Sequence, residues 1–187
     1  MKQSKSLYLS RRCCGLWLVL IAAVILLSMV TGGRYYLNPV IFGIGYATSL
    51  ILSLLNPAVR RRLAYGPMSA FQKRMSRVAL LVMFTLMSVF GGPYFSTMNW
   101  RMIWLGALLA TGLHFFVFYF VHGLPMLPLG LLCTLVAAVG YLLPGVPFYA
   151  VSIADVLIKA GFGVWLLLER DPNFEAITNM GGIDGEG

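Results

Sequence analysis

The fold is decided by the stretch FYAVSIADVLIKAGFGVWLLL, residues 148–168, whose 21 residues include only two that are charged at neutral pH. A helix needs about 20 mostly apolar residues to cross the hydrocarbon core of a bilayer. This stretch therefore has the length and the composition of a membrane-spanning helix. Five other stretches are similar, and they cover residues 14–31, 39–55, 78–95, 102–121 and 127–143.

The overall composition points the same way. The 187 residues are 59% hydrophobic and only 11% charged, whereas a soluble domain carries about 25% charged residues. A soluble chain of this size buries only about two thirds of the surface that it could expose, so it could not hide this much apolar area. The composition also excludes an intrinsically disordered chain and a disulfide-rich secreted module. The sequence predicts an integral membrane protein.

The six stretches are predicted to be helices. A strand of a membrane β-barrel would show about ten residues that alternate between apolar and polar, and these stretches do not alternate. Two Asn-Pro pairs, at residues 38–39 and 56–57, place a capping side chain before a proline at the first helical position. Ser69 and Gln72 have the spacing of a capping box. The sequence predicts an all-α, polytopic transmembrane bundle of about six helices.

The positive charges predict the orientation, because Lys and Arg near the ends of spans stay on the cytoplasmic side. With the N-terminus inside, eleven of the 14 basic residues face the cytoplasm, only Arg34 and Arg101 face outward, and Lys159 lies within a span. We therefore expect both termini to be cytoplasmic and the protein to lie in the cytoplasmic membrane of a cell. The predicted parts are a basic N-terminus at 1–13, a transmembrane domain at 14–168 with a cytoplasmic basic loop at 56–77, and a flexible cytoplasmic tail at 169–187.

The first span allows an alternative. A basic start followed by an apolar run is also the pattern of a signal peptide, and Val30 and Gly32 are small enough for cleavage after Gly32. Cleavage would leave five helices and would place the arginine-rich loop outside. We therefore favour an uncleaved anchor, with Trp17 near the inner interface, where aromatic rings prefer to lie.

The basic loop carries two groups of positive charge. Such charges hold a loop in the cytosol and bind anionic lipid headgroups, with about 1 kcal/mol from each residue. The net charge of +8 could also suggest nucleic acid, but the loop is too short for a folded nucleic-acid-binding module. We predict contacts with anionic lipids or with a docked partner, no nucleic acid, and either homo- or hetero-oligomers as open alternatives. The residues concerned are Arg60, Arg61, Arg62, Lys73, Arg74 and Arg77.

Three polar residues, His114, Asp155 and Lys159, interrupt the apolar spans. A charge at the middle of a membrane helix costs about 2.5 to 3.5 kcal/mol, and one large apolar residue offsets only about 0.3 to 0.6 kcal/mol of this. Asp155 and Lys159 are four residues apart and so share one face of a helix, in the order that favours an ion pair. His114 lies at a similar depth in its own span, so we expect the three side chains to form a cluster near the midplane.

Two interpretations of this cluster stay open. It could be the site of a small proton- or ion-coupled transporter or channel subunit, because ionisable residues inside a membrane usually serve a function. It could instead be a structural ion pair that fixes the register of the helices, and the lack of a second acid within the spans favours this interpretation. No catalytic, metal-binding or phosphate-binding motif is present. The sequence therefore predicts a non-enzymatic accessory or assembly protein without cofactor or metal.

One resemblance adds to this interpretation. It rests on AYGP at residues 64–67, FQKRM at 71–75, GLHFF at 112–116 and HG at 122–123. In these runs the chain resembles small, uncharacterised bacterial membrane protein families that are classed as domains of unknown function. The resemblance implies a bacterial multi-pass membrane protein of no known activity, so it assigns no catalytic residue.

Overall fold

The computed structural model describes residues 8–169, which contain seven α-helices and no β-strand. The all-helical prediction is confirmed. Most of the predicted basic N-terminus and flexible tail lies outside the described residues. The helices are α1 (Arg11–Val30), α2 (Pro39–Leu50), α3 (Pro57–Leu63), α4 (Ala70–Phe90), α5 (Trp100–His122), α6 (Met126–Leu142) and α7 (Phe148–Leu167). Short helical turns are η1 (Gly33–Tyr35), η2 (Ile51–Leu55) and η3 (Gly92–Tyr94).

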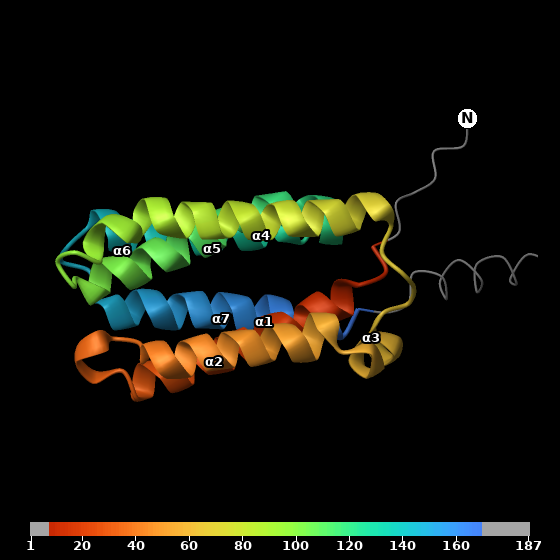
Figure 1. Cartoon of the computed structure of the whole chain (residues 1–187), viewed down its shortest axis with the longest axis horizontal. Helices are drawn as coiled ribbons and strands as arrows, with labels where there is room; N and C mark the ends of the chain where they lie inside the picture. The colour runs from red at the N-terminus through yellow and green to blue at the C-terminus, as the bar shows by residue number, and fades with distance from the viewer. Residues whose placement is uncertain (1–7, 170–187) are drawn as a thin grey trace, which may run out of the picture.

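The six long helices form two layers, with α4, α5 and α6 in one and α2, α1 and α7 in the other (Figure 1). The most extensive contacts join α5 to α6, α1 to α7 and α4 to α5. Contacts of α1 with α2 and of α6 with α7 complete the series α2–α1–α7–α6–α5–α4. Helices α2 and α4 are therefore the two ends of this series, and they make little contact with each other.

The predicted capping residues begin three of the helices. The side-chain oxygen of Asn38 accepts hydrogen bonds from the first amides of α2, at 3.1 and 3.2 Å, and Asn56 does the same for α3. Ser69 and Gln72 form both halves of a capping box at the start of α4. These caps satisfy amide groups that have no partner within the helix. The local sequence therefore sets where these helices begin.

Glycine residues let α1 and α7 approach closely. A Cβ atom on Gly15 would lie 2.7 Å from the carbonyl oxygen of Gly163, and one on Gly163 would lie 2.9 Å from that of Gly15. Distances this short are sterically forbidden, so only glycine fits at either position. Small residues serve the same purpose where membrane helices pack tightly. The contact fixes α7, which carries Asp155 and Lys159, against α1.

Helices α1, α5 and α7 are each long and apolar enough to cross a membrane. The segment Pro39–Leu55 would add a fourth span if it is counted together with α3, to which it is bent by 58°. Helix α4 differs from the predicted span 78–95, because it ends at Phe90 and a short 3-10 turn follows at Gly92–Tyr94. Gly91 and Pro93 follow the end of the α-helix, although the residues up to Phe95 are still mostly apolar.

The surface of the bundle is rich in apolar side chains. Leu27, Leu81 and Leu157 are 57%, 67% and 66% exposed, and each of the six long helices has large apolar residues of this kind. A soluble monomer rarely exposes apolar patches larger than a few hundred Å². The exposed apolar surface is therefore what a helix bundle surrounded by lipid would present.

Candidate functional site

Asp155 and Lys159 form an ion pair on α7, in which Lys159 Nζ donates a hydrogen bond to Asp155 Oδ2. The two residues are one helical turn apart, as their spacing requires. Asp155 is fully buried and Lys159 is 1% exposed. Bringing two charges out of water costs several kcal/mol for each ion, and their mutual attraction offsets this cost only when the geometry and the remaining hydrogen bonds are good. The pair is therefore an expensive feature of the interior.

The ion pair is incompletely satisfied. Asp155 Oδ1 has no hydrogen-bond partner within residues 8–169, and neither does the hydroxyl of Ser152, which is nearly one turn earlier on α7. Cys133 of α6 lies close to both members of the pair and is itself fully buried. A buried polar atom without a partner costs roughly 1–3 kcal/mol. The surroundings of the pair thus leave hydrogen-bonding capacity unused.

His114 lies on α5, is fully buried, and is close enough to Lys159 to experience its charge. Its Nδ1 contacts the carbonyl oxygen of Thr111. A carbonyl can only accept a hydrogen bond, so Nδ1 must donate, and in the neutral ring Nε2 is then an acceptor. Nε2 has no partner in the described part of the chain. The structure thus places the three predicted residues near one another, with only Asp155 and Lys159 in direct contact.

A cavity of about 140 Å³ lies beside Lys159, where α2 and α4 face each other. We call it the α2–α4 cavity. Its walls come from α1, α2, α4 and α5, and they are mostly aromatic and aliphatic. Lys159 is the member of the ion pair that reaches it. The wall side chains that carry a nitrogen or oxygen atom are Trp17, Tyr46, Trp104, Thr111 and Lys159.

A second, much smaller cavity of about 10 Å³ lies next to the first, and Trp17 and Tyr46 border both. It is near the lower limit of the space that holds one water molecule. His114 and His122 line it, and the ring of Phe118 lies between them, 5.1 Å from His114 and 5.5 Å from His122 between ring centroids. Trp17 Nε1, His114 Nε2 and His122 Nδ1 all have no hydrogen-bond partner among residues 8–169.

Sequence reasoning missed the burial of Trp17 and His122, which are both 4% exposed. Trp17 was expected at the membrane interface, but it is only 4% exposed and packs in the interior against Tyr46 and Phe115. The one available signal was its helical face, since Trp17, Ile21 and Ile25 follow the helix period. No group of three His, Cys, Asp or Glu side chains in the described ranges is placed to hold a metal ion.

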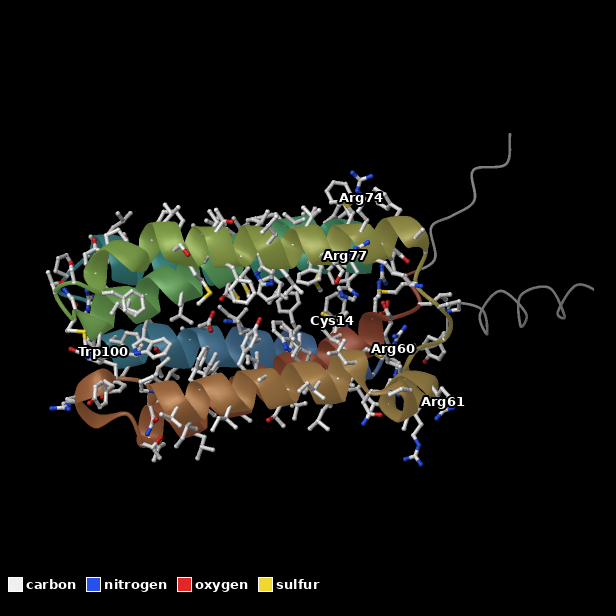
Figure 2. The ribbon with its side chains drawn as sticks, in the orientation of Figure 1. Cys14, Arg60, Arg61, Arg74, Arg77 and Trp100 are labelled. Carbon is white, nitrogen blue, oxygen red and sulfur yellow. The ribbon has the colours of Figure 1, made fainter. Side chains whose placement is uncertain are left out.

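The basic loop lies at one end of the bundle. Figure 2 shows Arg60 and Arg61 of α3 at the same end as Arg74 and Arg77 of α4, opposite Trp100. Arg62 and Lys73 belong to the same two helices, and all of these side chains except the half-buried Arg60 are exposed. Within residues 8–169 none of the six forms an ion pair. Within the described residues, therefore, no carboxylate neutralises the positive charge of these six side chains.

Two other arginines at this end hold helices together. Arg11 donates to the carbonyl oxygen of His122, at 2.7 Å, and pairs with Glu169. Arg12 donates to the carbonyl oxygen of Leu167 at 2.9 Å. These carbonyls are at the C-terminal ends of α5 and α7, which favour positive charge. The contact with Glu169 also places the two ends of the described segment side by side.

The fold and its interior define a class: an all-helical bundle, with helices able to cross a membrane and with an ion pair buried among them. The sequence pattern of DUF6609, a family of unknown function, matches residues 1–175. The chain belongs to this family. The resemblance to an uncharacterised family is therefore confirmed. No protein of curated function and no solved structure matches the chain.

Proposed function

We propose that this protein is a non-enzymatic, multi-pass membrane protein that acts through contacts with lipid and with other membrane proteins. The observation that carries this proposal is the sealing of the polar cluster, since His114, Asp155 and Lys159 are at most 1% exposed. A transport site must be reachable by water from at least one side, and the cavity beside Lys159 has mainly apolar walls. A sealed pair favours a structural use of the charges.

The proposed arrangement has six spans, with the basic loop and both termini in the cytoplasm. It is supported by the arginines that gather at one end of the bundle and by the two described chain ends, which lie at that same end (Figure 2). The positive-inside rule places such an end in the cytoplasm. There the exposed loop arginines would contact anionic headgroups, each with about 1 kcal/mol.

The ion pair is proposed to fix the position of α7. Its two charges cannot move to the lipid-facing side of the bundle without a cost of about 2.5 to 3.5 kcal/mol each. This cost keeps one face of α7 turned toward the interior, next to α6 and α5. The alternative function, a small proton- or ion-coupled transporter or channel subunit, is favoured by one observation: Lys159 borders a cavity rather than packed side chains alone.

The two functions can be separated with the full chain in liposomes. We expect the wild-type protein to add no proton-linked flux above that of protein-free liposomes, and Asp155→Asn to lower the melting temperature. Flux that depends on the protein and is lost in Asp155→Asn, at an unchanged melting temperature, would establish the transporter instead. If the wild-type protein shows no flux and Asp155→Asn leaves the melting temperature unchanged, both functions of the pair are contradicted.

The orientation has its own test. Protease sites placed at the two ends of the chain should be cut from the same face of sealed vesicles. Cleavage from opposite faces would require an odd number of spans and would overturn the proposed topology.

A further inference from the structure

We propose that the α2–α4 cavity binds a neutral lipophilic molecule that carries a carbonyl oxygen on a small ring, with its remaining apolar part leaving between α2 and α4. The cavity is partly open at its edge. Gly43 of α2 and Phe84 of α4 line it, Gly43 is exposed and Phe84 is 56% exposed. In the proposed membrane arrangement this edge faces lipid, so a lipophilic molecule could enter sideways.

The size of the cavity sets the size of the buried group. Its volume of about 140 Å³ is close to the volume of about 150 Å³ of an engineered apolar cavity that binds benzene. One six-membered ring therefore fits. The walls suit such a ring, because Phe42, Tyr46 and Trp104 surround the space with aromatic surface.

The polar groups of the cavity select an acceptor. Trp17 is 4% exposed and its Nε1–H, which can only donate, finds no acceptor within residues 8–169. The Lys159 ammonium has three N–H bonds, and its contact with Asp155 uses one of them. Both residues with unused donor capacity thus border a space whose hydroxyl groups, on Tyr46 and Thr111, already donate to Met83 Sδ and to the Ala107 carbonyl oxygen. A carbonyl oxygen is the simplest group that would satisfy the donors of Trp17 and Lys159.

The charge balance favours a neutral ligand. Asp155 already neutralises Lys159, so an anionic headgroup in the cavity would bring a second negative charge with no partner of its own. An unpaired buried charge is far more costly than an unpaired dipole. A purely apolar occupant, such as a lipid acyl chain, would fill the space but would leave both donors without a partner.

The test uses the full-length protein in lipid nanodiscs and two matched probes. 4-Decylcyclohexanone carries the ring, the carbonyl oxygen and an apolar tail, and decylcyclohexane lacks only the oxygen. We expect the ketone to bind saturably and to raise the melting temperature by about 5 °C at a concentration well above its Kd. The hydrocarbon should bind about tenfold more weakly, because it makes no hydrogen bond to the ammonium.

Variants locate the binding. Gly43→Leu should abolish the effect of the ketone, because Gly43 lines the cavity and a Cβ there would meet no atom within 4 Å. Gly161→Leu is the matched control, since Gly161 is also an exposed helical glycine with open space around it but does not line the cavity. It should bind the ketone as wild type does.

Two further variants examine the donors. Trp17→Phe keeps the ring and removes the indole N–H, and it should weaken binding of the ketone but not of the hydrocarbon. The double variant Asp155→Leu with Lys159→Met removes the ion pair without leaving a lone charge, and it should do the same. Equal binding of the two probes would show an apolar site only. Absence of binding, or binding that Gly43→Leu leaves unchanged, would also overturn the proposal.

Discussion

The contact between α1 and α7 and the boundary between α2 and α4 differ in how closely the two helices approach each other. At the first, Gly15 and Gly163 bring two backbones so close that no side chain fits between them. At the second, the helices stand apart over a cavity of about 140 Å³. Both pairs of helices contain glycine, so the residue type alone does not distinguish them. What distinguishes them is whether the glycine faces a neighbouring backbone.

The ion pair connects these two regions. Asp155 and Lys159 lie on α7, about two turns and one turn before the close contact at Gly163, and Lys159 also borders the cavity. The close contact between α1 and α7 therefore holds Lys159 in place beside the α2–α4 cavity. We therefore expect substitutions of Lys159 and Gly163 on α7 to lower the free energy of unfolding more than a substitution of Gly43 on α2.

The largest effect is expected from Lys159→Met. It removes one partner and leaves the Asp155 carboxylate buried without compensation, which should cost about 3–5 kcal/mol of unfolding free energy. Adding Asp155→Leu to the same chain should restore most of the loss, because an apolar pair of similar volume has no charge to bury. Unfolding of the three proteins in mixed micelles would measure this. A double variant as unstable as the single one would mean that the charges themselves are required.

Gly163→Leu is expected to cause the second largest loss of stability. A Cβ atom at this position would already lie 2.8 Å from Val19 Cγ2 and 2.9 Å from the Gly15 carbonyl oxygen. Forcing α1 and α7 apart should cost about 3 kcal/mol, the upper part of the usual range for overpacking. Gly161→Leu, two residues earlier on the same helix, has open space and should be nearly neutral. Equal melting temperatures for both variants would show that the α1–α7 contact is looser than the structure implies.

Much of this architecture could be predicted from the sequence, because it depends on local patterns. Asn38 and Ser69 are followed by the helices that their capping chemistry indicates. The spacing of Asp155 and Lys159 was enough to predict that they share a face. Helix α4 ends at Phe90, just before Gly91, whereas the apolar stretch behind the predicted span 78–95 continues to Phe95.

The parts that could not be predicted depend on which helices become neighbours. The α2–α4 cavity exists because these two helices end the contact series, and no periodicity within either one encodes that order. Trp17 illustrates the same limit, since it belongs to an apolar face whether that face meets lipid or protein. The role of Arg101 was also missed, because the carbonyl groups that it binds are about forty residues away in the sequence.

Arg101→Met is expected to cause the third largest loss of stability. Arg101 was counted as one of two basic residues on the outer side, and its guanidinium donates to the carbonyl oxygens of Gly140 and Val146, each at 2.9 Å. Arg101→Met should therefore destabilise the α6–α7 connection by about 1–2 kcal/mol, the value of hydrogen bonds to a charged group at a partly exposed site. Among residues 8–169, the hydrogen bond and the cation–π contact of Arg34, the other outer arginine, are both with the neighbouring Tyr35, so Arg34→Met should leave the melting temperature unchanged. A similar loss in both variants would point to a general effect of charge rather than to these bonds.

The smallest change in stability is expected for Gly43→Leu, and this variant is also the most direct test of the α2–α4 cavity. Gly43→Leu adds a side chain where a Cβ meets nothing within 4 Å, and it removes the flexibility of a glycine within a helix, which is worth about 0.5–1 kcal/mol. Stability should therefore be unchanged or slightly higher. Gly45→Leu, two residues later on α2, would place its Cβ 2.7 Å from a methyl group of Val24 on α1 and should be destabilising. If both variants lose stability to the same extent, α2 packs against α4 more closely than the cavity allows, and the contrast between the two regions disappears.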